Sequence, residues 1–491
     1  MRGSFILFAS VLAAGAAGCG KAKEQPKARH PGTGTGAGTG TASTVAAKAT
    51  CPAGEAKGPL TWIEDDYAGA LACARAKHRP LLIDMWAPWC HTCLSMKSTV
   101  LMDASLAPLN DQLVFLSMDT DKPTNADALA KYPLVNWPTF FVVEPDHETV
   151  QGRWLGAAST GQMRTFLKDG ETAALAAMSG GGLDPLLAKV REGDQASERK
   201  EFAAAEAAYG AALAQAPADW PRRSDVLVAQ IGARYKQGDI AGCLDLGLSS
   251  ADATGDTANA ADFLVWALMC ADDDKADPAK AKAVREKAVA RLTALVDDQA
   301  APLSIDDRSD AMANLREALD SLGKKDEAKK VAERQLAFLA DAAAKAPDAW
   351  TRMTYNWPRA DVHVYLGRGL ELVPALEQSA KDLPNEYDPP ARLAWVLLKS
   401  GKADDAQPWV EKALRLVYGP RKVRVQQLAA DIAKARGNVA MERAARTALV
   451  STLEHLEKGQ EQPEALAKAK ADLAAMDGAA GTAAGSGSAS P

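Results

Sequence analysis

The sequence predicts a multidomain protein in which an α/β domain is followed by an all-α helical-repeat domain. A short apolar run over 81–86 follows a proline, which is typical of a buried strand, and 94–101 lacks Gly and Pro, which favours a helix. A second proline opens another apolar strand over 138–143. From about residue 184 the chain is rich in alanine, with Glu, Lys, Arg and Leu at helical spacing. The length of 491 residues allows two or three domains.

Two cysteines, Cys90 and Cys93, lie between the first predicted strand and helix. Cysteines at this spacing can close a small disulfide ring. At a helix start, the unpaired N–H groups and the positive end of the helix dipole favour the thiolate of Cys90 over its thiol. That thiolate attacks disulfides, and Cys93 then attacks the mixed disulfide and releases the product. Strand, CxxC and helix in this order therefore predict thiol–disulfide chemistry.

These motifs resemble the thioredoxin family, most closely the C-terminal domain of the DsbD group of periplasmic disulfide reductases. The resemblance rests on residues 83–93, 102–103 and 137–139 and covers roughly residues 59–178. It implies a central mixed sheet flanked by helices, in a domain placed at 51–178. It also implies that a redox-active disulfide takes the place of any bound cofactor.

The resemblance assigns a role to each residue of the site. Cys90 is the nucleophile and Cys93 the resolving thiol. Pro138 is a cis-proline that faces the disulfide and leaves the backbone beside it free to pair with an extended substrate. Asp84 is a carboxyl beneath Cys93, and burial is expected to raise its pKa, so that it can take the proton from Cys93 during exchange.

The chain departs from the family pattern at two points. Family members often carry a lysine near the acid on the central strand, and the corresponding stretch 113–118 has none, so Asp84 is expected to be harder to ionise. The dipeptide between the cysteines, His91-Thr92, is unlike the common family pairs. An imidazole at His91 would tune the site, because it stabilises the thiolate of Cys90 and makes the disulfide more oxidising.

Other interpretations of these residues stay open. A CxxC can be half of a zinc site, but structural zinc needs four ligands, and the sequence has no second CxxC or HxxxH, so no metal is expected. The disulfide could be purely structural, Asp84 a paired core acid and His91 a solvated residue. Trp89 and Trp137 flank the chemistry and are expected to form an exposed apolar docking surface for substrate, with core packing as the alternative.

The N-terminus predicts export. Residues 1–18 combine a basic start, an apolar run too short to span a bilayer and small residues before Cys19, which together indicate a signal peptide. The ending resembles a bacterial lipoprotein signal and implies that Cys19 is lipidated, with ordinary cleavage as the alternative. Residues 19–50 then form a disordered Gly/Thr-rich tether. The expected location is the periplasmic or cell-envelope side, and Gly20, where inner-membrane lipoproteins often carry aspartate, favours the outer membrane.

The remaining cysteines agree with export. Setting aside the lipidation and redox cysteines leaves Cys51, Cys73, Cys243 and Cys270. An even remainder in an exported protein permits two structural disulfides. Pairing of neighbours in sequence would join Cys51 to Cys73 and Cys243 to Cys270, with free buried cysteines as the alternative.

The helical-repeat domain is expected over 184–476. Residues 202–213 resemble the second helix of a tetratricopeptide repeat, with small residues where helices cross and aromatics filling the gaps. Helix–turn–helix units follow with turns at Gly238, Gly323 and Gly401, at irregular spacing. Such an array presents a concave groove to a protein or peptide ligand, and a simple spacer is the alternative.

Composition limits the other partners. A net charge of -6 argues against nucleic acid. No later segment is long and apolar enough to span a bilayer, so the lipid is the one expected membrane anchor. The Gly/Ala/Ser tail over 477–491 is expected to be disordered.

Together these features predict an exported, membrane-tethered thiol–disulfide oxidoreductase of the protein-disulfide reductase type, with a role in cell redox homeostasis. Its substrates would be protein thiols and disulfides. Its electrons would come from a separate membrane donor, because the chain has no NADPH or flavin motif. The helical repeats would recruit partners. The alternatives are a non-enzymatic envelope scaffold built on tetratricopeptide-like repeats, and a disulfide oxidase or isomerase.

Overall fold

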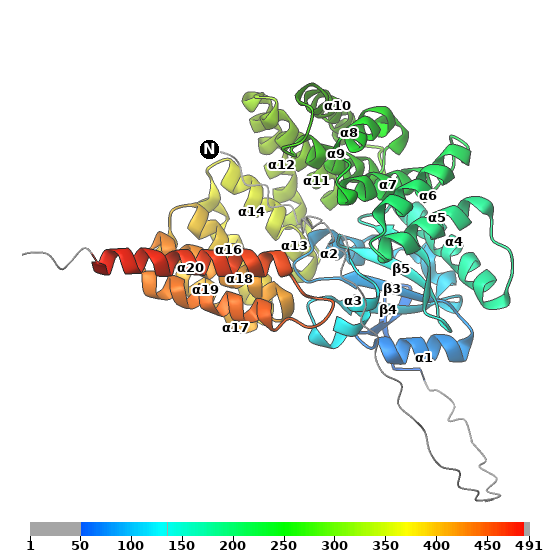
Figure 1. Ribbon diagram of the computed structural model, residues 1–491, viewed down its shortest axis with the longest axis horizontal. Coiled ribbons are helices and arrows are strands. Elements are labelled where there is room, and N and C mark those ends of the chain that lie inside the picture. Colours follow the sequence, from blue (N-terminus) through cyan, green and yellow to red (C-terminus); the bar gives the residue numbers. More distant parts are fainter. Residues whose placement is uncertain (1–50, 135, 486–491) are drawn as a thin grey trace, which may run out of the picture.

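The computed structural model describes residues 51–134 and 136–485 (Figure 1). The predicted signal peptide, Cys19 and the tether lie outside the described residues. The strands are β1 (Glu55–Lys57), β2 (Leu60–Glu64), β3 (Leu81–Trp86), β4 (Val114–Asp119), β5 (Thr139–Glu144) and β6 (Thr149–Leu155). The helices of the first domain are α1 (Tyr67–Lys77), α2 (His91–Ser98), α3 (Ala126–Lys131) and α4 (Thr160–Ser179).

The first domain is built around a six-stranded mixed sheet with the order β1-β2-β4-β3-β5-β6. β3 is parallel to β4 and antiparallel to β5. Successive residues point to opposite faces of the sheet. Leu82 and Phe140 pack with α2 and α4, whereas Ile83 and Phe141 pack with α1 and α3. The predicted mixed sheet flanked by helices is therefore confirmed, and β3, which leads to the CxxC, lies in its interior.

The rest of the chain is helical, as predicted. Its helices are α5 (Pro185–Glu198), α6 (Phe202–Gln215), α7 (Arg223–Gln237), α8 (Ile240–Ser250), α9 (Ala258–Ala271), α10 (Pro278–Asp297), α11 (Ile305–Ser321), α12 (Lys325–Lys345), α13 (Ala349–Thr354), α14 (Asn356–Tyr365), α15 (Val373–Asp382), α16 (Asp388–Lys399), α17 (Ala403–Leu416), α18 (Lys422–Ala435), α19 (Val439–Glu454) and α20 (Pro463–Gly485). We call this region the helical-repeat domain.

Glycines end several helices and turn the chain into the next one. Gly238, Gly323 and Gly401 follow α7, α11 and α16 with φ of +79°, +76° and +75°, in the left-handed region that favours glycine. These are the turns predicted from the sequence. Gly437, between α18 and α19, makes a further turn of this kind that was not predicted.

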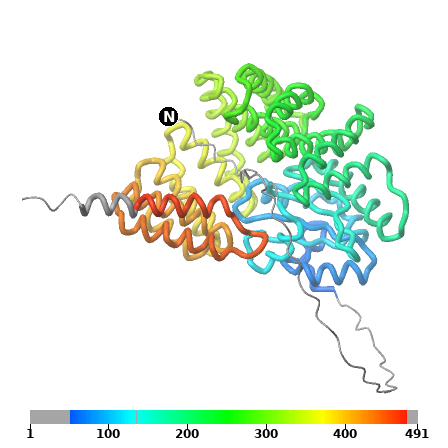
Figure 2. The backbone as a smooth tube through the Cα atoms, in the orientation of Figure 1, coloured from blue at the N-terminus to red at the C-terminus, as the bar shows by residue number. Residues whose placement is uncertain are grey.

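The helical-repeat domain curves back onto the first domain (Figures 1 and 2). Helices α5 to α12, in green, lead away from the sheet at the β6 side, where α5 packs on β6. The later helices, in yellow to red, return to the first domain near α2, where α13 contacts α2; α11, of the green group, also contacts α2. The first domain is thus held between two distant parts of the same chain.

Two disulfides lie away from the CxxC. Cys51 is bonded to Cys73, which fixes the start of the described chain to α1. Cys243 is bonded to Cys270, which joins α8 to α9.

The C-terminal tail differs in part from the prediction. Helix α20 continues to Gly485, so residues 477–485 are helical where a disordered tail was expected. The physical reason is the alanine in this segment, because alanine has the highest helix propensity. Residues 486–491 lie outside the described part.

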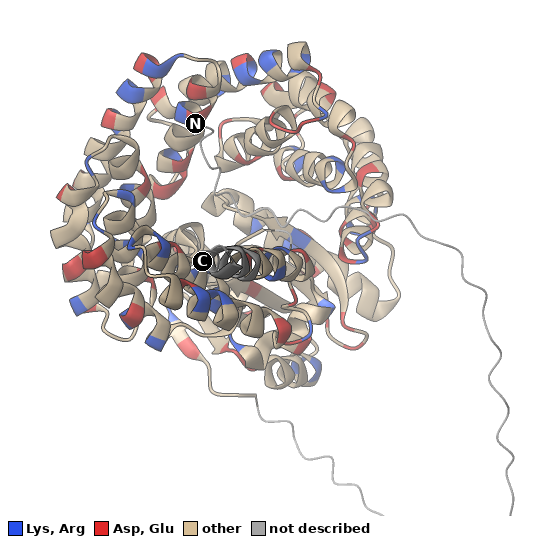
Figure 3. Cartoon of the chain, turned by 60° about the vertical axis from the view of Figure 1, so that its left-hand side comes forward, with Lys and Arg blue, Asp and Glu red and all other residues tan. Residues whose placement is uncertain are grey.

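The described helices carry mixed charge. Lys and Arg positions are interspersed with Asp and Glu positions along the helices in the view of Figure 3. None of the helices within the described ranges combines the length and apolar character needed to cross a membrane.

Candidate active site

Helix α2 places the two cysteines of the CxxC at its N-terminus. Cys90 is the N-cap of α2, and its Sγ accepts the backbone N–H of Cys93 at 3.0 Å. The two side chains are joined in a disulfide. When this disulfide is reduced, the N–H groups and the dipole at the helix start favour a thiolate on Cys90.

The loop before β5 brings a cis-proline to the same place. The Trp137–Pro138 peptide bond is cis. Thr139, the first residue of β5, pairs with Met85 near the end of β3, so this loop lies beside the segment that leads to α2. The Trp137 ring packs against the hydrophobic cluster that contains both cysteines.

A partly buried ion pair joins β3 to α2. The carboxylate of Asp84, in β3, is 2.9 Å from Nζ of Lys97, which lies one turn after Cys93 on α2. Lys97 also donates to Ser117 of β4 at 2.8 Å. Burial raises the pKa of Asp84, and the Lys97 ammonium opposes that rise. The expectation that Asp84 lacks a lysine partner is therefore wrong, because α2 supplies the lysine and β4 carries Ser117 beside Asp84.

Replacing Lys97 by methionine is expected to raise the pKa of Asp84 further, because burial then acts without the opposing ammonium. A carboxyl with a higher pKa becomes an effective base only at higher pH. The acidic limb of the pH–rate profile of thiol–disulfide exchange should therefore move to higher pH. A shift of one pH unit corresponds to a rate about tenfold lower on that limb. The control Lys97→Arg keeps the charge and should leave the limb in place. An unmoved limb in Lys97→Met would show that Asp84 does not take the proton.

Trp89 and Trp137 do not form the exposed docking surface that was predicted. Both are partly buried. The Trp89 indole N–H donates to Asp121 at 3.0 Å, and the Arg421 guanidinium lies over the Trp89 ring at 4.5 Å. Arg392, on α16, donates to the Trp89 carbonyl at 3.3 Å. Because burying aromatic surface is favourable, the helical-repeat domain covers Trp89, one of the two residues that a substrate was expected to contact.

The loop after β4 is held by the same domain. Burial and the neighbouring Asp119 carboxylate raise the pKa of Asp121 to about 7. The carboxyl groups of Asp119 and Asp121 and the backbone carbonyl of Thr120 all accept hydrogen bonds from the helical-repeat domain. These bonds run from Tyr418 to Asp119, from Tyr387 to Asp121 and from Gln460 to the Thr120 carbonyl. We call Trp89, His91, Leu94 and residues 119–121 the redox face.

His91, the first residue of α2, lies against α11. Its Nδ1 is 3.0 Å from both carboxylate oxygens of Asp306 and 3.9 Å from Asp310. Burial disfavours the imidazolium, but the nearby carboxylates outweigh burial and raise the pKa of His91 to about 9. The ring therefore carries a positive charge at neutral pH, next to Cys90.

The same three side chains are the one group among the described residues with the spacing of a metal site. His91, Asp306 and Asp310 each offer one ligand atom, and these atoms lie within 4.8 Å of one another. The direct contact of the His91 ring with Asp306 already satisfies both groups as an ion pair.

Packed against the redox face, the helical-repeat domain leaves little of the Cys90–Cys93 disulfide accessible to solvent. Cys90 is 5% exposed and Cys93 is 1% exposed. Leu94, one turn into α2, packs with Met353 and Leu383 of the helical-repeat domain. A folded client can therefore reach Cys90 only if the helical-repeat domain shifts from the redox face.

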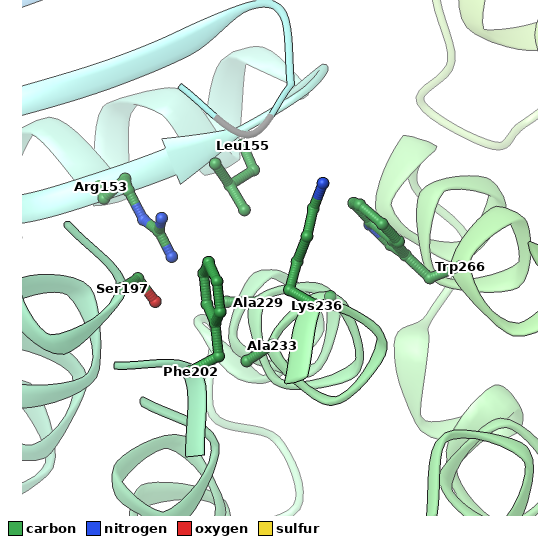
Figure 4. A pocket seen from close by; sticks show the side chains of 9 residues that line it. Arg153, Leu155, Ser197, Phe202, Ala229, Ala233, Lys236 and Trp266 are labelled. Atoms are coloured by element: carbon green, nitrogen blue, oxygen red, sulfur yellow. The ribbon is translucent and has the colours of Figure 1, made fainter. Parts of the chain in front are cut away.

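A small pocket lies elsewhere, between β6 and helices α7 and α9 (Figure 4). Its volume of about 10 Å³ leaves room for a single water molecule. Its labelled side chains are Arg153, Leu155, Ser197, Phe202, Ala229, Ala233, Lys236 and Trp266. None of them belongs to the redox face.

The structure brings most of the predicted site residues together. Those at the CxxC are Asp84, Trp89, Cys90, His91, Cys93, Trp137 and Pro138. The two remote disulfides lie apart from them, and Cys19 is outside the described residues.

Three residues of the site were not predicted, namely Lys97, Asp121 and Asp306. Lys97 had a local signal, because it follows Cys93 by four residues and so shares its helix face. Asp121 and Asp306 had no such local signal, because the side chains that they contact lie on other helices or loops, far away in the sequence.

Comparison with known proteins supports the fold of the first domain. Residues 62–145 match a family model described as thioredoxin-like. This segment runs from within β2 to just past β5 and includes the CxxC and the cis-proline. No curated protein matches the chain. Among solved structures, the chain is similar to a tetratricopeptide repeat protein from Parabacteroides merdae ATCC 43184. That likeness has 14% identity and a TM-score of 0.37, and it covers 58% of this chain and 98% of the other.

Proposed function

We propose that this chain, which joins a thioredoxin-like domain to an all-helical domain, is an exported thiol–disulfide oxidoreductase of the protein-disulfide reductase type. One observation carries the proposal. The Cys90–Cys93 disulfide lies at the N-terminus of α2, beside a cis-proline loop, and α2 also carries Lys97, which pairs with the buried Asp84 of β3. A purely structural disulfide would need neither the helix N-terminus nor a buried acid with a raised pKa.

The proposed reaction moves two electrons from the cysteine pair to a client disulfide. The Cys90 thiolate attacks one client sulfur, which forms a mixed disulfide and releases the other client sulfur as a thiolate that takes up a proton. Cys93 gives its proton to Asp84 and attacks Sγ of Cys90. The bond between Cys90 and the client breaks, and the second client sulfur leaves as a thiolate that takes up a proton, while Asp84 gives up the proton it received. The Cys90–Cys93 disulfide is thereby restored.

Re-reduction requires an outside electron source, and we assign it to a separate membrane donor that exchanges with Cys90. The disulfides Cys51–Cys73 and Cys243–Cys270 support an oxidising compartment outside the cytoplasm. A lipid at Cys19 and the tether would keep the protein at the cell envelope. The helical repeats would recruit protein or peptide partners, because such arrays commonly bind them.

The test is insulin reduction by the full-length reduced protein, followed by re-reduction with a reduced thioredoxin-type donor. The expected result is catalytic precipitation of the insulin B chain above the uncatalysed rate. Absence of exchange with both insulin and a small disulfide would overturn the proposal.

The packing of the helical-repeat domain against the redox face favours a second function. With Cys90 only 5% exposed, the thioredoxin-like domain could serve as a docking module inside a non-enzymatic envelope scaffold. The double variant Cys90→Ser/Cys93→Ser separates the two functions. An unchanged cellular phenotype in that variant would support the scaffold.

The direction of electron flow is tested by the reduction potential of Cys90–Cys93. A charged His91 beside Cys90 favours the thiolate of Cys90 and hence a more oxidising disulfide. A disulfide oxidase or isomerase is therefore the alternative to a reductase. A potential of about -270 mV would support a reductase, and one of about -120 mV an oxidant.

A further inference from the structure

We infer that the helical-repeat domain completes the redox site, and that Asp306 is a positioning residue that holds the His91 ring and its positive charge beside Cys90. This inference rests on the proposed oxidoreductase function and adds to it the residue through which the second domain acts. Asp306 belongs to α11 and lies 215 residues after His91 in the sequence.

The contact has a defined geometry. Both oxygens of Asp306 lie 3.0 Å from Nδ1 of His91, and the Asp306 side chain is fully buried. One turn further along α2, the Ser95 hydroxyl donates to Ser304 at 3.1 Å. Ser304 is the N-cap of α11 and forms a capping box with Asp307, which fixes the first turn of that helix. The first turn of α11 is therefore anchored to α2 at two points on one helix face.

The charges around His91 explain why Asp306 is needed to keep the imidazole ring positively charged. Asp306 and Asp310 of α11 stabilise the imidazolium, and Asp307 on the same turn also interacts with its charge. Burial and the Arg392 guanidinium of α16 act in the opposite direction. Asp306 makes the shortest of these contacts, so its loss leaves burial and Arg392 opposed mainly by the more distant Asp310.

The consequence is a link between domain docking and cysteine chemistry. An unperturbed histidine has a pKa of about 6.5 and is mostly neutral at pH 7.5. Docking of α11 turns His91 into a fixed cation at the helix end where the Cys90 thiolate forms. By thermodynamic linkage, a thiolate stabilised in the docked state also favours docking in the reduced protein.

The test is an NMR titration of the full-length oxidised protein labelled with ¹³C at histidine. The His91 signal is assigned by its disappearance in His91→Gln. In Asp306→Asn the pKa of His91 should fall from about 9 to near the ordinary value of about 6.5. Asp306→Glu should restore most of the difference, and Asp310→Asn should lower the pKa by less than Asp306→Asn does. The exposed acid Asp341 gives the matched control Asp341→Asn, with no change expected.

A second readout reports on Cys90 itself. In a Cys93→Ser background, the rate of Cys90 alkylation by iodoacetamide is measured between pH 5 and 9. With Asp306 present, the profile should show no step from His91 below pH 8, whereas Asp306→Asn should add a step near the new pKa of His91.

The two proposals fail in different ways. A pKa of His91 that stays near 9 in Asp306→Asn, in a wild-type protein that exchanges disulfides, would overturn the inference alone. A wild-type protein that exchanges no disulfide, while Asp306→Asn still lowers the pKa of His91, would refute the proposed function and reduce the contact to a structural ion pair.

Discussion

Reduced protein carrying Cys93→Ser is expected to accumulate a covalent complex with its client. Cys90 lies at the N-cap of α2, so its thiolate still attacks the client disulfide. The serine hydroxyl cannot attack the mixed disulfide, so the second step stops and turnover falls to the uncatalysed rate. The measurement is non-reducing electrophoresis with insulin, in which dithiothreitol should release the trapped chain.

The matching variant Cys90→Ser should form no complex and show no turnover. Cys93 is only 1% exposed and lies within α2, so it cannot replace Cys90 as the first nucleophile. The double variant Cys243→Ser/Cys270→Ser is the control, because it removes a disulfide in the helical-repeat domain and should keep exchange. Trapping by Cys90→Ser would reverse the two roles, and normal turnover in either single variant would refute the mechanism.

The parts of the site that could be predicted are those whose signals lie close together in the sequence. The apolar run after Pro80 predicted the strand that the structure shows as β3, and the proline before 139–144 predicted β5. The CxxC follows β3 within a few residues, so strand, cysteines and helix formed one local pattern. The Gly turns of the repeats were predicted for the same reason, because left-handed backbone demands glycine at that position.

The covering of the redox face could not be predicted, because its contacts join residues with no shared local pattern. Tyr387 donates to Asp121 across 266 residues, and no local pattern links the two positions. A tryptophan beside a CxxC looks equally suited to binding a substrate and to packing under another domain. Only the path of the helical-repeat domain decides between them. The lysine partner of Asp84 could not be predicted for a different reason, because it lies on α2, whereas the resemblance pointed to the central strand.

The other end of the helical-repeat domain is fixed to the sheet by buried charges. Asp194, on α5, accepts the backbone N–H of Arg153 in β6 at 3.0 Å and the Tyr209 hydroxyl at 2.8 Å. The Arg153 guanidinium lies 3.7 Å from Asp194 and donates to Tyr209 at 2.9 Å. Arg153 and Asp194 are almost completely buried. This network sets the direction in which α5 and α6 leave the sheet, and with it the path that returns to the redox face.

Replacing Asp194 by leucine is expected to lower the free energy of unfolding by about 3–5 kcal/mol, because it removes the buried carboxylate that contacts the Arg153 guanidinium and leaves Glu198 as the remaining acid near that cation. Urea denaturation followed by far-UV circular dichroism measures the change. The exposed pair Lys345–Asp341 gives the control, and Asp341→Ala should change stability by no more than about 0.5 kcal/mol.

The double variant Arg153→Met/Asp194→Leu distinguishes a lost charge partner from lost packing. Burial raises the pKa of Asp194 even though the Arg153 guanidinium opposes that rise, so ionising this carboxyl is costly here, and a buried ion pair can often be replaced by apolar residues at little cost. The double variant should therefore be more stable than Asp194→Leu alone, although it removes more native contacts. If it is less stable by the sum of both single changes, Asp194 acts through packing and hydrogen bonds to Tyr209, and the buried cation is not the source of the loss.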